Sequence, residues 1–126
     1  MARTDDEARR QTMDTAHETL HEVTAAGRKL RDAIPEVYSG YARLSAAAMA
    51  DGHLPGKVKE LIALAIAATR ECDGCIAAHA RGAASRGVTA PEVAEALGVA
   101  IMMNGGPGTV WGPRAYAAFQ EYAAES

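Results

Sequence analysis

The chain has 126 residues, the length of one domain that can bury a substantial core, and its 48% apolar content excludes a disordered protein. A formal net charge of −3, with no lysine- or arginine-rich run longer than a dipeptide, argues against a nucleic-acid partner. No apolar run reaches the roughly 18 residues of a membrane-spanning helix, and the charged first residues lack the apolar segment of a secretory signal. We therefore expect a single domain over residues 1–126, cytoplasmic, with no membrane partner.

The spacing of apolar residues predicts helices in the first half of the chain, and abundant alanine with only 5% aromatics favours helices over strands. A first helix is expected over residues 5–32, because its apolar residues recur at three- and four-residue steps. They are Met13, Ala16, Leu20, Val23 and Leu30. A second helix is expected over residues 35–50, with Val37, Tyr41 and Leu44 on one face.

The central segment predicts two further helices that follow a turn rich in helix breakers at residues 51–56. Pro55 is suited to the first position of a helix over residues 55–70. That helix is apolar or small on every side from Leu61 to Thr69, which predicts burial all round. The next helix, over residues 72–86, is expected to end before Gly87.

Two helices complete the prediction. Thr89 and Glu92 form a capping-box sequence at the start of a helix over residues 90–104. The glycine-rich residues 104–108 predict a turn, and a last helix over residues 109–124 carries Trp111, Tyr116 and Phe119. No segment alternates with the period of a strand, so the expected fold is all-α, a compact bundle of five to six helices.

Cys72, Cys75 and His79 form the pattern Cys-x-x-Cys-x-x-x-His at a predicted helix start. Cysteines three residues apart lie on the same side of a helix, close enough for a disulfide after modest adjustment of the first turn. The helix N-terminus favours the thiolate, which is the reactive form, and His79 can accept the thiol proton or stabilise the thiolate. We therefore expect a dithiol/disulfide pair, with the pKa of the Cys75 thiol below the ~8.5 of free cysteine.

Two other interpretations of these residues remain open. The cysteines can be ordinary small packing residues, with His79 a solvated neighbour. The trio can also be part of a zinc site, although such a site wants four ligands and the fourth would have to come from Glu60, His53 or a partner chain. No second Cys/His pair exists, so we expect no metal and no cofactor.

Glu60 has two possible environments that the sequence does not separate. A carboxylate is almost never fully buried unless it is paired, so a buried Glu60 needs a partner, and His79 is a candidate. An exposed Glu60 would instead pair with Lys57 in the first turn of its helix. His17 and His21 have a spacing that can bind metal, but no matching acidic pattern accompanies them, and a polar helix face is the better interpretation.

The stretch KELIALAIAATRECDGCIAAHARGAASRGVTAPEVAEALGVAIMMNGGPG resembles the core of the carboxymuconolactone decarboxylase-like superfamily, over about residues 54–122. The resemblance implies an all-helical homo-oligomer, commonly a trimer or hexamer. Members with both cysteines resemble alkylhydroperoxidase D, a peroxide reductase. By motif, Cys75 matches the peroxide-attacking cysteine, Cys72 the resolving one, and His79 and Glu60 members of the proton relay. Gly74 stands where alkylhydroperoxidase D has a second histidine, so one link of that relay is missing.

The resemblance and the motif together predict a thiol-dependent peroxidase that takes a hydroperoxide substrate and an external dithiol reductant. The catalytic residues would be Cys75, Cys72, His79 and Glu60. A redox-sensing or structural oligomer without turnover is the second hypothesis. A decarboxylase-like lyase is the third, and the cysteine pair argues against it because that branch does not depend on one.

Overall fold

The computed structural model describes Thr4 and residues 15–125, and in this part of the chain it contains six helices and no strand. The helices are α2 (Thr15–Ala33), α3 (Pro35–Met49), α4 (Gly56–Thr69), α5 (Asp73–Ser85), α6 (Ala90–Asn104) and α7 (Gly106–Ala123). The predicted all-α class is therefore confirmed. None of these helices combines the length and apolar character needed to cross a membrane.

The helix boundaries of the described residues follow the sequence signals closely, with one exception at the start of α7. The predicted capping box is present, since the Thr89 side chain accepts from the backbone N–H of Glu92 and the Glu92 side chain accepts from the backbone N–H of Thr89. The glycine-rich turn is shorter than predicted, because α7 already begins at Gly106 and the break is confined to Gly105, whose φ is +71°. A proline in the first turn of α7 explains this, since proline is preorganised for a helix start. Residues 5–14 of the first predicted helix lie outside the described residues.

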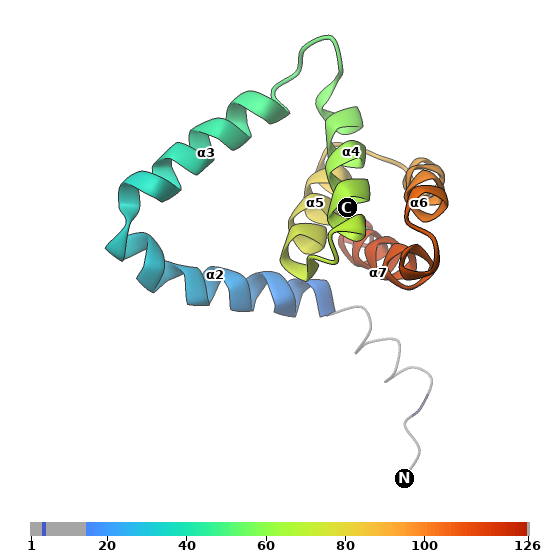
Figure 1. The fold of residues 1–126 in the computed structure, drawn as a ribbon, viewed down its shortest axis with the longest axis horizontal. Coiled ribbons are helices and arrows are strands. Elements are labelled where there is room, and N and C mark those ends of the chain that lie inside the picture. Colours follow the sequence, from blue (N-terminus) through green and yellow to red (C-terminus); the bar gives the residue numbers. More distant parts are fainter. Residues whose placement is uncertain (1–3, 5–14, 126) are drawn as a thin grey trace.

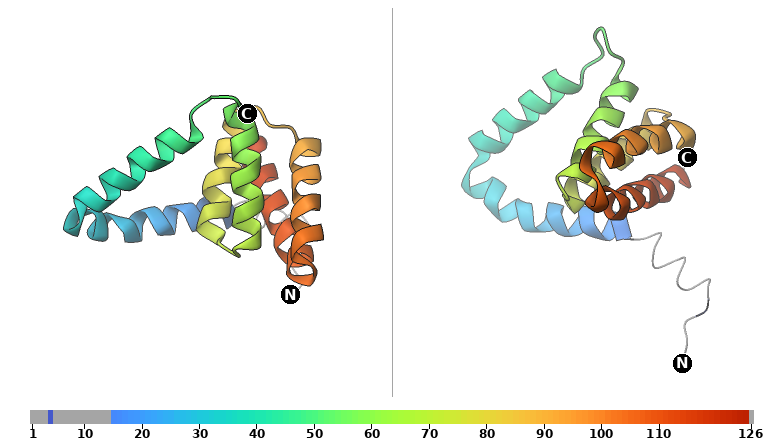
Figure 2. Two further views of the ribbon diagram at one scale, coloured as in Figure 1. Left: turned by 45° about the horizontal axis from the view of Figure 1, so that its top comes forward. Right: turned by 45° about the vertical axis from the view of Figure 1, so that its right-hand side comes forward.

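The molecule consists of a bundle and an arm. Helices α4, α5, α6 and α7 pack against one another, while α2 and α3 extend to one side and enclose an open triangle with α4 (Figures 1 and 2). The arm touches the bundle mainly where α2 begins, against α5, and where α3 leads into the loop before α4. No residue of α3 is buried in the single chain.

The core of the bundle is built from small side chains around a few large ones. Leu64, Val93 and Phe119 are the largest fully buried residues, and alanines of α4, α5 and α7 fill the spaces between them. Trp111 and Tyr116 pack against the same core. The bundle itself therefore buries Phe119 and partly buries Trp111 and Tyr116.

Apolar side chains remain exposed along the arm and on the outer face of α4. Val23, Leu30, Val37, Tyr41 and Leu44 of the arm are 53–70% exposed. On α4, Leu64 is buried but Ile62 and Ile66 are 45% and 54% exposed. The prediction of burial all round for this helix is wrong in the single chain, because α5, α6 and α7 cover the face that carries Leu64 and leave Ile62 and Ile66 exposed.

Buried Glu121 of α7 fixes the beginning of the arm. Its carboxylate accepts hydrogen bonds from the backbone N–H groups of Ala16 and His17, at 3.1 and 2.7 Å, and pairs with Nδ1 of His17. The His17 ring also stacks on Tyr122, with 4.3 Å between ring centroids, and its Nε2 pairs with Glu125. The His17 side chain is 38% exposed, and it supplies the partner that the buried Glu121 carboxylate needs.

Candidate functional site

The two cysteines lie at the junction between α4 and α5. Glu71 turns the chain with a left-handed backbone (φ +54°), and Cys72 is the N-cap residue of α5. Cys72 and Cys75 form a disulfide, with their Cα atoms 5.2 Å apart, and the backbone N–H of Cys75 donates to Sγ of Cys72 at 3.2 Å. The sulfurs therefore lie at the positive end of α5, where a thiolate is favoured once the bond is reduced.

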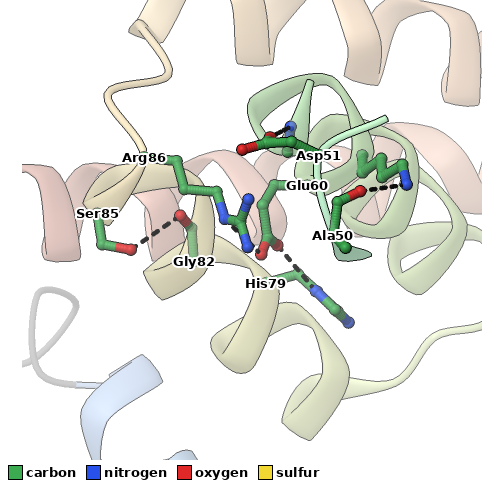
Figure 3. A network of polar contacts seen from close by, with 9 residues as sticks. Ala50, Asp51, Glu60, His79, Gly82, Ser85 and Arg86 are labelled. Atoms are coloured by element: carbon green, nitrogen blue, oxygen red, sulfur yellow. Dashed lines mark hydrogen bonds and ion pairs between the residues drawn. The ribbon is translucent and has the colours of Figure 1, made fainter. Parts of the chain in front are cut away.

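His79 lies one turn further along α5 and pairs with a buried carboxylate. Its Nδ1 is 3.0 Å from Oε2 of Glu60, a residue that is only 6% exposed on α4 (Figure 3). A carboxylate can only accept, so Nδ1 carries the proton and Nε2 of a neutral ring is left as the base. Among the described residues, no hydrogen bond joins His79 to either sulfur in this disulfide form.

Of the two environments considered for Glu60, the structure has the buried one. Helix α4 packs against α5, which turns the Glu60 carboxylate toward His79. Lys57 instead pairs with Glu92 at the start of α6, at 3.2 Å. The pKa of Glu92 is lowered by hydrogen bonds from the backbone of Thr89 and the side chains of Lys57 and Thr89. Lys57 therefore pairs with Glu92, and Glu60 pairs with His79.

Arg86 is a member of this cluster that sequence reasoning missed. It is the C-cap residue of α5, and its Nε is 3.6 Å from Oε1 of Glu60. A signal was present, because His79, Gly82 and Arg86 follow one another at steps of three and four residues and so share one face of the helix. A buried carboxylate opposite that face needs more than one donor, which is the clue that would have found it.

Gly74, which stands where alkylhydroperoxidase D has a second histidine, packs closely against the arm. A Cβ atom on Gly74 would lie 3.3 Å from Cγ2 of Val23 in α2. A Cβ atom at this position therefore requires the Val23 side chain to shift by a few tenths of an ångström. In this chain α2 occupies the space beside the disulfide on that side.

Glu60, His79 and Arg86 line a groove of about 970 Å³ between the bundle and the arm. The opposite wall belongs to α2 and α3 and includes Arg31, whose guanidinium lies over the ring of Tyr38. The His79 side chain is 32% exposed toward this space. The groove thus gives solvent and small molecules access to the His79–Glu60 pair.

His53, considered as a fourth zinc ligand, is exposed in the loop before α4. Across Thr4 and residues 15–125, no three His, Cys, Asp or Glu side chains are grouped so as to hold a metal ion.

Comparison with known proteins gives a consistent result. The model of the carboxymuconolactone decarboxylase family matches residues 35–123, which begins earlier than the core expected from the sequence. An uncharacterized protein of Cupriavidus necator is 38% identical over 100 residues, covering 79% of this chain and 88% of its own length. An uncharacterized protein from the cox locus of Paracoccus denitrificans is 34% identical over 110 residues, covering 87% and 93%.

One solved structure has the same fold at significant sequence identity. It is the apo form of a carboxymuconolactone decarboxylase family protein from Legionella pneumophila, 36% identical, with a TM-score of 0.84. The match covers 87% of this chain and 98% of that one. The arm and the bundle therefore both lie within the compared region.

Proposed function

Since the chain belongs to the carboxymuconolactone decarboxylase family, we propose that it is a thiol-dependent peroxidase-like oxidoreductase of the alkylhydroperoxidase D type. One observation carries the proposal: a redox-capable cysteine pair at a helix N-terminus shares helix α5 with a histidine held by a buried carboxylate. Packing alone would give no reason to bury Glu60 against His79 one turn beyond the cysteines.

The reaction starts from the reduced pair. The Cys75 thiolate attacks the terminal oxygen of a hydroperoxide, the O–O bond breaks, and the alkoxide takes up a proton and leaves as an alcohol, so that Cys75 becomes a sulfenic acid. The Cys72 thiol then attacks that sulfur, water leaves, and the disulfide forms. An external dithiol reduces the disulfide by exchange and is itself oxidised. The Cys72–Cys75 disulfide is the bond that this proposed cycle would form.

His79 is suited to the proton transfers of both steps. With Nδ1 donating to Glu60, Nε2 can accept the Cys75 proton and return it to the leaving oxygen. Cys75 is the exposed cysteine and Cys72 the half-buried one, which fits attack by Cys75 and resolution by Cys72. Glu60 acts through His79 and holds its tautomer.

The decisive experiment is the mass of the reduced protein after one equivalent of cumene hydroperoxide. We expect loss of two hydrogens per chain with no covalent dimer, and in Cys72→Ser we expect a trapped sulfenic acid on Cys75. A Cys75→Ser variant should consume no peroxide. Unreacted thiols in the wild type would refute the proposal and favour a structural protein, while a disulfide formed without turnover by a dithiol would favour a redox sensor. Product formation from an unsaturated lactone acid would favour the lyase.

We extend the proposal to a homo-oligomer, a trimer or hexamer. Apolar side chains of α2, α3 and α4 remain exposed in the single chain, and exposed apolar patches mark association sites. Light scattering at micromolar concentration should give a multiple of the 13.2 kDa chain mass. A monomer mass would contradict this part of the proposal.

A further inference from the structure

The Glu60 carboxylate has a different partner at each oxygen. Oε2 faces Nδ1 of His79 at 3.0 Å, and Oε1 faces Nε of Arg86 at 3.6 Å. Figure 3 shows the two side chains approaching the carboxylate from different directions. Helix α4 thus supplies the carboxylate, the middle of α5 supplies His79, and the C-cap of α5 supplies Arg86.

Two glycines leave the space that this arrangement occupies. A Cβ atom on Gly82 would lie 2.5 Å from Oε1 of Glu60, and one on Gly56 would lie 1.5 Å from Nη1 of Arg86. Neither glycine has a positive φ, so the backbone does not require glycine at either position. Glycine in a helix costs about 0.5–1 kcal/mol relative to alanine. The physical reason for glycine at both positions is the space that the side chains of Glu60 and Arg86 occupy.

We infer that Arg86 is a positioning residue, which holds the Glu60 carboxylate so that Oε2 stays on Nδ1 of His79. The guanidinium gives the buried carboxylate a counter-charge on the side away from His79. Without it, the carboxylate loses the partner that fixes its rotation, and the proton of a neutral His79 distributes between both ring nitrogens. The inference rests on the proposed function only where it assumes that His79 transfers protons for Cys75.

The test is the tautomer of His79, observed through the ¹⁵N chemical shifts of its ring at a pH where the ring is neutral. His79→Gln identifies the signal. The wild type should show Nδ1–H predominantly, and Arg86→Met should show a mixture. Arg86→Lys should restore part of the wild-type pattern, because its ammonium keeps the charge. Gly56→Ala should resemble Arg86→Met, because the new Cβ displaces the guanidinium without removing it. Arg81→Met on the same helix is the matched control and should leave the signal unchanged.

Single-turnover oxidation of Cys75 provides the functional readout. Arg86→Met should slow it by about tenfold, a part of the 10²–10⁴-fold contribution typical of general acid–base catalysis. If both Arg86→Met and Gly56→Ala keep the wild-type tautomer of His79, the inference is overturned, whatever the rate of Cys75 oxidation. If the tautomer shifts but the wild type does not react with hydroperoxide, the proposed function fails and the positioning role of Arg86 stands.

Discussion

Replacing Gly82 with alanine perturbs Glu60 without touching any functional group. In an ordinary helix interior this substitution stabilises a protein by about 0.5–1 kcal/mol. Here the new Cβ would lie 2.5, 2.6 and 2.7 Å from Oε1, Cδ and Oε2 of Glu60, closer than any contact a methyl group can make. The carboxylate has to move, which disturbs its contacts with His79 and Arg86.

The magnitude follows from the contacts that would be lost. A hydrogen bond to a charged group contributes about 1.5–3 kcal/mol, and Glu60 makes one with His79 in addition to its ion pair with Arg86. Part of the Arg86 contribution is screened, because its side chain is 38% exposed. Subtracting the helix-propensity gain of about 0.5–1 kcal/mol leaves a net destabilisation of about 0.5–2.5 kcal/mol for Gly82→Ala.

Urea unfolding, followed by circular dichroism at fixed protein concentration, measures this change. Gly98→Ala is the matched control, because Gly98 is also inside a helix and its Cβ would meet no atom within 4 Å. We expect the control to raise the free energy of unfolding by about 0.5–1 kcal/mol and Gly82→Ala to lower it. If both variants gain equal stability, Glu60 is not confined as described, and the reasoning about the site is refuted.

Three further predictions concern the arm, the core and the turn before the cysteines. Burial lowers the pKa of His17, but the hydrogen bond to Glu121 and the charges of Glu125 and Glu121 outweigh it and raise that pKa above 6.5. The stability lost in His17→Gln should therefore be greatest below about pH 6.5 and shrink as the pH rises through the raised pKa; a loss independent of pH would contradict this. Tyr122→Phe should leave thermal stability unchanged or raise it by up to about 1 kcal/mol, because the buried Tyr122 hydroxyl has no partner among the described residues; a clear loss would reveal one. Glu71→Gly should raise stability by up to about 1 kcal/mol by relieving the left-handed backbone, and a lower melting temperature would count against that strain.

Local sequence signals determined the helices and the position of the cysteine pair. Periodic apolar residues, the Thr89–Glu92 capping box and the stop at Gly87 each act within one or two turns, so they can be recognised without knowing the fold. The spacing of Cys72, Cys75 and His79 is likewise a property of a single helix. These features follow from hydrogen bonds and side-chain geometry along a short stretch of chain.

Contacts between helices decided the rest. Glu60 is buried rather than exposed because α4 packs on α5, and nothing within α4 itself distinguishes the two outcomes. Arg86 and His17 find carboxylates 26 and 104 positions away along the chain, at distances that no local pattern encodes. Phe119 of α7 is 2% exposed while Tyr41 of the arm is 70% exposed, because burial depends on which neighbouring helix supplies the opposing surface. A sequence shows which side chains need a partner, but packing in three dimensions selects the partner that each one receives.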